Sequence, residues 1–151
     1  MFEIKRILFA CDLTEYASKI LHYVISLAEK YDSEIYVMHV VQDLKYCGNV
    51  YLHYDFLNVG ETEIFHSAEK ALTTFCQTYF HGCTHVHKKI VSGMPSTEII
   101  KTIKEEAIDL VVMGSHGYTG IEHTIFGSVA ENVMKKSTVP VLVVNPYRYS
   151  R

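Results

Sequence analysis

The stretch Asp109-Leu-Val-Val-Met-Gly-Ser-His-Gly-Tyr-Thr-Gly-Ile-Glu-His-Thr-Ile-Phe-Gly-Ser128 decides how this chain is interpreted. It opens with a short apolar run, Leu110 to Met113, which has the length and composition of one buried parallel strand. A helix-compatible apolar pattern resumes near Ile125. Between the two lies a turn that is rich in glycine, with Gly114, Gly117 and Gly120.

A strand that leads into a glycine-rich turn ahead of a helix suits a bound phosphate. Glycine lets the backbone approach an anion closely and adopt positive φ, while the free N–H groups of the helix's first turn point at the anion. The alternative is an ordinary strand–loop–helix connection, and the glycines by themselves leave both interpretations open.

The spacing of the motif adds information. Two residues separate Gly114 from Gly117, nine separate Gly117 from Gly127, and Ser128 follows. This G-x-x-G-x9-G-[S/T] pattern resembles the nucleotide-binding motif of the universal stress protein family, in its ATP-binding branch. The resemblance covers nearly the whole chain, and its other segments are Ile7–Glu15, His39-Val40, Gly93-Met94-Pro95 and Val139–Val144.

Length and composition predict one compact domain that spans residues 1–151, because 48% of the residues are hydrophobic. The formal net charge of −3 argues against a nucleic acid or a membrane surface as partner. Met1–Arg6 is charged, the apolar run after it is too short for a secretion signal, and no stretch is long enough to span a membrane. We therefore expect a soluble cytoplasmic protein, in which the four cysteines are reduced thiols.

Alternating patterns of strand and helix run along the chain. The expected strands are Ile4–Ala10, Glu34–Val41, Val86–Val91, Leu110–Met113 and Val141–Val144. Apolar residues at helical spacing mark the helices between them: Ala17, Ile20, Leu21, Val24, Ala28 and Tyr31; Phe65, Ala68, Leu72, Phe75, Cys76 and Tyr79; Ile99, Ile100, Ile103 and Ala107; Val129, Val133 and Met134. Thr14 is expected as a helix N-cap, Gly82 as a C′ residue and Pro95 in a first turn. The connection Gln42–Gly60 has no clear period.

This alternation predicts an α/β fold, a doubly wound parallel sheet with helices on both faces. The family resemblance implies five strands in the order 3-2-1-4-5, an adenine nucleotide alpha hydrolase-like arrangement. In such a sheet the ligand crevice lies at the carboxyl ends of the strands on either side of the switch point, here the first and the fourth. These strands end at Ala10-Cys11-Asp12 and at Met113-Gly114, so topology and glycine motif indicate the same place.

The resemblance implies a nucleotide site there. Asp12 would lie near the nucleoside, the backbone of Val40 would hydrogen-bond the adenine edge, and Ser128 would donate to a phosphate. Where the family often has Pro-Thr, this chain departs from the pattern at Ala10 and Cys11. The expected nucleotide-binding residues are Ala10, Cys11, Asp12, Val40, Met113, Gly114, Ser115, His116, Gly117, Thr119, Gly120, Gly127, Ser128 and Val129.

No protein side chain is expected to ligate a metal. The glycine loop contains no Lys or Arg, so phosphate charge would be balanced by backbone dipoles and by Mg²⁺ or Mn²⁺ bound through the phosphates. Cys83, His85 and His87 alternate and would share one face of a strand, where Zn²⁺ or Cu²⁺ is one interpretation. A polar edge strand with scattered histidines is the interpretation we favour.

The sequence contains neither a P-loop nor a G-x-G-x-x-G dinucleotide fingerprint. We expect a protein that binds ATP or AMP as a nucleotide-dependent regulator in a stress response. Two alternatives stay open: a slow ATPase or phosphotransferase, and a dimeric stress-response interaction protein with a vestigial pocket. No catalytic residue is assigned, because no pair of base and cation lies near the glycine loop. The resemblance also implies a homodimer through Val141 to Val144, an apolar edge that would otherwise be exposed.

Overall fold

The computed structural model describes residues 3–42, 60–115 and 127–148. Strands and helices alternate as the sequence predicts. In chain order they are β1 (Arg6–Ala10), α1 (Glu15–Tyr31), β2 (Glu34–Gln42), α2 (Glu61–Tyr79), β3 (Val86–Gly93), α3 (Pro95–Glu105), β4 (Leu110–Gly114), α4 (Ser128–Lys136), β5 (Val141–Val144) and the 3-10 helix η3 (Pro146–Arg148). Residues 43–59, most of the connection without a clear period, lie outside the described part of the chain.

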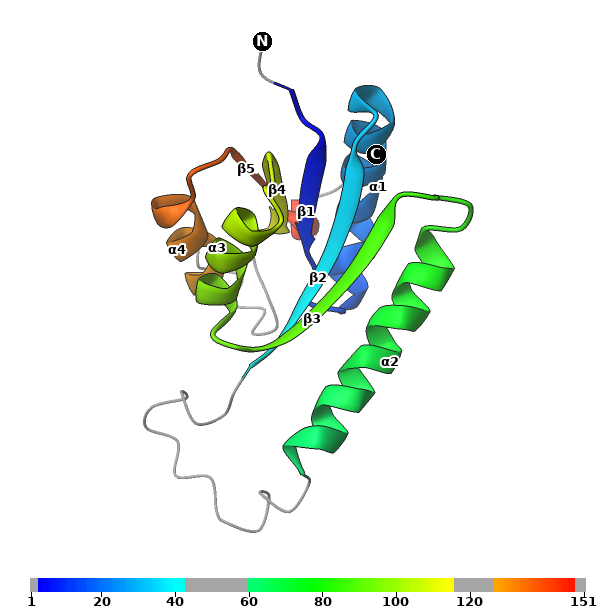
Figure 1. Ribbon diagram of the computed structural model, residues 1–151, viewed down its shortest axis with the longest axis vertical. Coiled ribbons are helices and arrows are strands. Elements are labelled where there is room, and N and C mark those ends of the chain that lie inside the picture. Colours follow the sequence, from blue (N-terminus) through cyan, green and yellow to red (C-terminus); the bar gives the residue numbers. More distant parts are fainter. Residues whose placement is uncertain (1–2, 43–59, 116–126, 149–151) are drawn as a thin grey trace.

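The five strands form one parallel sheet in the order β3-β2-β1-β4-β5, which confirms the predicted topology. Helices α1 and α2 lie on one face of the sheet, and α3 and α4 lie on the other (Figure 1). At the centre of the sheet Ala10 pairs with both Met38 of β2 and Met113 of β4. The three central strands are therefore in register where they approach their carboxyl ends.

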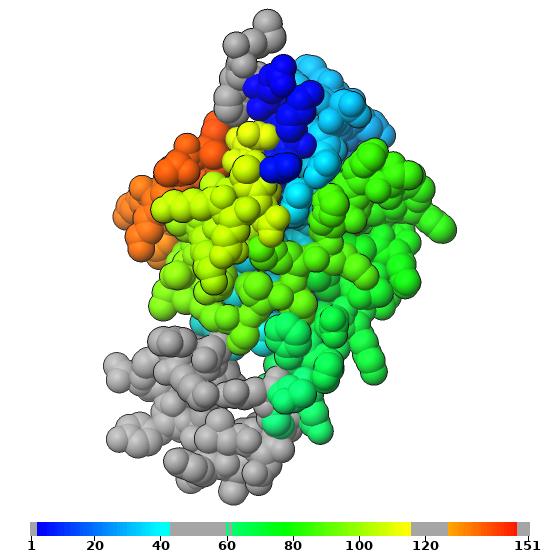
Figure 2. Space-filling model, in the orientation of Figure 1, coloured from blue at the N-terminus to red at the C-terminus, as the bar shows by residue number. Residues whose placement is uncertain are grey.

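Two hydrophobic cores result from the alternation of side chains along β1. Ile7 and Phe9 face α1 and α2, while Leu8 faces α3 and α4, and all three are fully buried. Side chains fill the spaces that the ribbon leaves open between α3 and β3 (Figure 2). Fully burying each such side chain contributes about 1.5–3 kcal/mol, so β1 stabilises both cores at once.

Some residues expected in the core lie outside it, at the ends of helices, beyond an end, or on the exposed side of α4. Tyr31 and Tyr79 end their helices and are more than a third exposed, as is Met134. Ala107 follows α3 with a φ of +48° and is exposed, and Ile108 is the residue buried there. At the end of α2 Phe80 is buried in place of Tyr79, and Gly82, with a φ of +82°, lies two residues beyond the C-cap Phe80.

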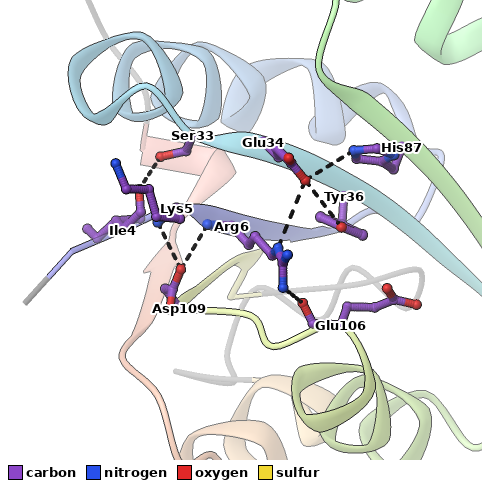
Figure 3. Close-up of polar contacts among 9 residues, drawn as sticks. All are labelled: Ile4, Lys5, Arg6, Ser33, Glu34, Tyr36, His87, Glu106 and Asp109. Carbon is purple, nitrogen blue, oxygen red and sulfur yellow. Dashed lines mark hydrogen bonds and ion pairs between the residues drawn. The ribbon is translucent and has the colours of Figure 1, made fainter.

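Asp109 fixes the start of β1. Its Oδ2 atom accepts hydrogen bonds from the backbone N–H groups of Lys5 (2.8 Å) and Arg6 (2.9 Å), as Figure 3 shows. Strand β1 accordingly begins at Arg6 and not at Ile4 as expected. The side chain that precedes β4 thus holds the amino end of β1, which ties the two central strands together before their ladder begins.

Charged side chains gather at this amino end of the sheet. Glu34 Oε2 lies 3.3 Å from His87 Nε2 and 3.9 Å from Arg6 Nε, while Arg6 Nη1 donates to the Glu106 carbonyl at 3.1 Å (Figure 3). Nearby, Lys89 Nζ donates to the Glu106 carboxylate at 2.7 Å. This hydrogen bond lowers the pKa of Glu106 against the effect of desolvation. Partial burial works to lower the pKa of Lys89, but the hydrogen bonds to Glu106 and Glu105 outweigh it and raise that pKa.

No helix in residues 3–42, 60–115 and 127–148 combines the length and the apolar character needed to cross a membrane.

We expect Lys89→Met to lower the free energy of unfolding by about 0.5–1 kcal/mol near neutral pH, because the pair is partly exposed and screened. A carboxyl whose folded pKa is lowered stabilises above its unfolded pKa, for which 4.5 is the ordinary value, and this stabilisation is lost as the pH falls through the folded pKa. The difference from wild type should therefore shrink in urea titrations from about pH 5 toward about pH 3.

Lys101→Met is the matched control. Lys101 Nζ lies 3.8 Å from Glu105, and its side chain is 60% exposed. We expect this variant to differ little from wild type at any pH. Equal losses in both variants, with the same dependence on pH, would contradict a specific role for the Lys89–Glu106 pair.

Candidate functional site

A crevice begins where β1 and β4 end side by side. The ladder between these strands closes with Ala10 opposite Met113, and the chain then continues through Cys11-Asp12 on one side and Gly114-Ser115 on the other. In Figure 1 the carboxyl ends of β1 and β2 point downward, away from the labelled N-terminus. The structure therefore brings the acidic turn and the start of the glycine loop together, as the sequence predicts for the switch point.

Asp12 stabilises the turn that follows β1. Its Oδ1 atom accepts from the Thr14 backbone N–H at 3.0 Å and from the Thr14 hydroxyl at 2.7 Å, which is an Asx-type turn. Leu13, between them, has a φ of +60°, a conformation that a leucine adopts at a cost. Thr14 is the N-cap of α1 as predicted, but its hydroxyl bonds Asp12 instead of a backbone N–H of the helix.

Cys11 is a core residue whose thiol is not activated. Its side chain is 5% exposed and belongs to the core beneath α1 and α2. Burial raises the pKa of the Cys11 thiol to about 12, a backbone hydrogen bond from Leu13 opposes this, and the nearby Asp12 and Cys76 raise it further. The thiol is therefore neutral at physiological pH and is no nucleophile. The Cys11 N–H donates to the Met38 carbonyl at 2.8 Å, which extends the ladder to β2 by one bond.

The backbone of Val40 is directed at the crevice. Along β2 the backbone groups of even-numbered residues face β1, and the Glu34 N–H, for example, donates to the Lys5 carbonyl. The backbone groups of odd-numbered residues face β3, and the Ile35 N–H donates to the His85 carbonyl. Val40 is even-numbered and lies beyond the last β1 residue that pairs with β2. Its N–H and C=O consequently face the space that β1 has left.

The two ends of the glycine loop meet at its base. The Gly127 N–H donates to the Ser115 carbonyl at 2.6 Å, and the Ser115 N–H donates to the Val144 carbonyl of β5 at 2.8 Å. Gly127 is the N-cap of α4, and no side chain within the described residues caps this helix start. Ser128, the first residue of α4, is exposed. The N-terminus of α4 is thus held directly beside the end of β4, with the N–H groups of its first turn available to a ligand.

The remaining predicted site residues divide between core and undescribed segments. Met113 is buried, and Val129 is half-buried against the core beneath α3 and α4. The predicted site residues that lie outside the described part of the chain are His116, Gly117, Thr119 and Gly120.

The crevice offers an anion no cationic side chain from the segments that border it. Residues 10–14, 38–42, 113–115 and 127–129 contain neither Lys nor Arg. An anion in the crevice would therefore be attracted by the positive end of the α4 dipole and by the N–H groups of the turns. A polyphosphate would therefore bind best together with a cation, and the Asp12 carboxylate reinforces that need.

Two other surfaces offer no comparable site. Cys83 lies in the turn before β3 and not on the strand, while His87 bonds Glu34 and stacks on Tyr36 with ring centroids 4.6 Å apart. Within the described ranges no group of three His, Cys, Asp or Glu side chains could hold a metal ion. A hollow of about 530 Å³ runs along the first turns of α2, and the described residues that line it are Glu63, Ile64, Ser67, Ala68 and Ala71.

Sequence reasoning missed two features of the crevice. The Cys11 carbonyl accepts a hydrogen bond from the ring Nδ1 of His39 at 2.8 Å, and Leu13 has positive φ. The Asp-x-Thr pattern signals the Asx turn, and hence a bend at Leu13. No local sequence pattern predicts the contact between His39 and the Cys11 carbonyl, because the two residues are far apart along the chain.

Comparison with known proteins adds to this geometry. The universal stress protein family profile matches residues 3–145. Universal stress protein MJ0577 of Methanocaldococcus jannaschii is 31% identical over 152 residues, which cover 93% of this chain and 94% of that protein. The solved structure of MJ0577 is similar with a TM-score of 0.80 at 30% identity and covers 98% of this chain and 99% of its own.

Two further solved structures with this fold contain nucleotides. One is a universal stress protein in complex with cAMP, with a TM-score of 0.62 at 17% identity over 95% of this chain and 98% of that one. The other, from Archaeoglobus fulgidus in complex with dAMP, has a TM-score of 0.66 at 16% identity over 96% of this chain and 100% of that one. At these identities the likeness shows the fold alone. The family profile and the similarity to MJ0577, each spanning almost the whole length, establish that this chain belongs to the universal stress protein family.

Proposed function

We propose that this protein binds an adenine nucleotide, ATP or AMP, in the crevice between β1 and β4, and acts as a nucleotide-dependent regulator in a stress response. The observation that supports this most strongly is the 2.6 Å hydrogen bond between the Gly127 N–H and the Ser115 carbonyl. It holds an uncapped helix N-terminus at the switch point of the sheet, where a phosphate is best stabilised.

Each wall of the crevice has a part in this binding mode. Asp12 uses Oδ1 within its turn, and its second carboxylate oxygen accepts from a ribose hydroxyl. The backbone of Val40 hydrogen-bonds the adenine edge, and Ser128 with the first N–H groups of α4 binds the phosphates. Mg²⁺ or Mn²⁺ bound through the phosphates balances the charge that no Lys or Arg of the bordering segments neutralises.

The nucleotides found in relatives support the same ligand class. One solved relative is in complex with cAMP and another with dAMP, and both ligands contain adenine. Those two proteins share the fold of this chain, and their ligands differ in sugar and phosphate. A common adenine base agrees with a site in which the base is bound by the backbone of β2.

We propose binding without efficient turnover. Hydrolysis needs an oriented water and a positive group that stabilises the phosphoryl transition state. The segments that border the crevice contain Asp12, which is engaged in its turn, and neither Lys nor Arg. A slow ATPase is the competing proposal, and release of phosphate from ATP under single-turnover conditions distinguishes the two.

We further propose that two copies associate through β5. This strand pairs with β4 on one side and is the edge of the sheet on the other, with Leu142 36% exposed. An exposed apolar edge of this kind is a template for strand pairing. The other edge strand, β3, has exposed polar side chains at His87, Lys88 and Ser92, which protect it from such association.

We expect wild-type protein stripped of nucleotide to bind ATP with Mg²⁺ in isothermal calorimetry, and Gly117→Val to lose this binding. A valine in the glycine loop would prevent the close approach of backbone and phosphate. AMP, with fewer phosphates, should bind with less dependence on Mg²⁺ than ATP does.

Gly60→Val is the control, because an added Cβ at Gly60 meets no atom within 4 Å and this residue lies at the start of α2. It should bind ATP as wild type does. If wild type binds no adenine nucleotide, or if Gly117→Val stays folded and binds as tightly as wild type, the proposed site is wrong.

We expect Val143→Glu and Leu142→Glu each to give a monomer by light scattering, because a charge on β5 opposes pairing of two edges. Leu142 is included because it is exposed, so that its replacement leaves the core intact. Ser92→Glu, on the opposite edge strand β3, should keep the dimer mass. A wild-type protein with the mass of a single chain would refute the assembly outright.

A further inference from the structure

The hydrogen-bond ladder between β1 and β2 ends in an unusual way. Its regular steps reach the bond from the Cys11 N–H to the Met38 carbonyl. The next step of a parallel ladder would join the Val40 N–H to the Cys11 carbonyl. Among the residues that the structure describes, that backbone bond is not formed, and the Cys11 carbonyl is instead bonded by the His39 ring.

The chemistry of this contact is determined by the carbonyl. A carbonyl oxygen can only accept, so His39 must donate, and its proton must lie on Nδ1. The distance of 2.8 Å is that of a well-formed hydrogen bond. The ring therefore satisfies an acceptor that would otherwise compete for the Val40 N–H.

The turn after β1 makes this arrangement possible. Leu13 at a φ of +60° and the two hydrogen bonds to Asp12 Oδ1 lead the chain away from β2 within three residues of Ala10. His39 joins that turn to the end of β2. Its ring donates a hydrogen bond to the Cys11 carbonyl at a point where, among the described residues, no backbone N–H of β2 does so.

We propose that His39 is a positioning residue for base recognition: by donating to the Cys11 carbonyl it leaves the Val40 N–H and C=O unpaired and aimed at the adenine edge. This inference rests on the proposed function. A neighbouring N–H and C=O offer one donor and one acceptor. Adenine complements them with a ring nitrogen that accepts and an amino group that donates, whereas guanine presents an acceptor, O6, where adenine has its amino group.

The inference makes His39 a determinant of specificity more than of total affinity. Without the His39 ring, the Cys11 carbonyl is free to accept a hydrogen bond from the Val40 N–H. That bond would extend the ladder between β1 and β2 by one step and remove the donor from the crevice. The proposed phosphate contacts at Gly127 and Ser128 lie at the start of α4, outside the ladder between β1 and β2, and are left unchanged. Loss of His39 should therefore reduce discrimination between bases and spare the dependence on Mg²⁺.

The test compares ATP with GTP in calorimetry, on wild type, His39→Leu and His39→Asn. We expect His39→Leu to bind ATP about three- to tenfold more weakly, the effect of one lost hydrogen bond, with a smaller ratio of ATP to GTP affinity. His39→Asn should restore the ratio, because the asparagine Nδ2 occupies nearly the place of the histidine Nδ1. His87→Leu, which removes a histidine at the amino end of the sheet, should keep the wild-type ratio.

A measurement without nucleotide gives an independent readout. Nitrogen-15 NMR should show His39 with its proton on Nδ1, and the Val40 amide should exchange with solvent faster than its neighbours in β2. In His39→Leu the Val40 amide should become protected. A bare Nδ1 in wild type, or an unchanged Val40 amide in the variant, would overturn the inference.

The outcomes separate the two proposals. Wild type that binds no adenine nucleotide refutes the proposed function, and the inference falls with it. Wild type that binds ATP, together with a His39→Leu variant that keeps both the fold and the ratio of ATP to GTP affinity, refutes the inference alone.

Discussion

The pairing of β1 with β4 is the constraint on which the candidate site depends. Both strands are buried along their length, and the four register pairs from Ile7–Leu110 to Ala10–Met113 bring their carboxyl ends together. Asp109 strengthens this pairing from the other end, because its carboxylate binds the backbone N–H groups of Lys5 and Arg6. A slip of one residue would turn every buried side chain of β1 to the opposite core. The acidic turn and the glycine loop are neighbours, although about a hundred residues separate them, because this register is fixed by burial.

The crevice exists because two ladders stop at the same level. Beyond Ala10 the chain turns through Asp12 and Leu13, and beyond Gly114 it enters the glycine loop. Strands normally end where their backbone groups find other partners, since an unpaired buried N–H or C=O is costly. Here side chains and loops take over: Asp12 binds Thr14, His39 binds the Cys11 carbonyl, and the Ser115 carbonyl binds Gly127. The backbone of Val40 is left facing the open side, and a ligand is the partner that would complete it.

The sequence was sufficient to predict the alternation of strands and helices, because most elements have a clear hydrophobic period. Strand β5 was predicted with its observed bounds, and α1 begins after Thr14 as expected. Two of the errors share a physical cause, because periodicity does not show where a helix ends. Tyr31 and Ala107 continue an apolar stripe in sequence, but the first is the exposed last residue of α1 and the second lies past α3 with positive φ. The contact between His39 and Cys11 could not be predicted for a different reason. It depends on β1 ending at Ala10, opposite Met38, while β2 continues to Gln42. The local sequence around His39 contains no information about where β1 ends.

The distribution of charge bears on what the crevice can distinguish. Arg6 and His87 lie near the amino end of the sheet with Glu34 and Glu106, and Lys89, opposite Met38 in the middle of β3, reaches Glu106 with its side chain. The segments that border the crevice contain neither Lys nor Arg. A helix N-terminus provides roughly half a positive charge, far less than a triphosphate requires. In the proposed binding mode, phosphates would contribute favourably only together with a cation, whereas the base and the ribose would meet polar groups that are already in place. It follows that affinity should depend on adenine recognition at β2, while the number of phosphates should act through the metal ion. A change in the ratio of ATP to AMP would then act on this protein through the bound cation. A change in the base of the nucleotide would act through the end of β2.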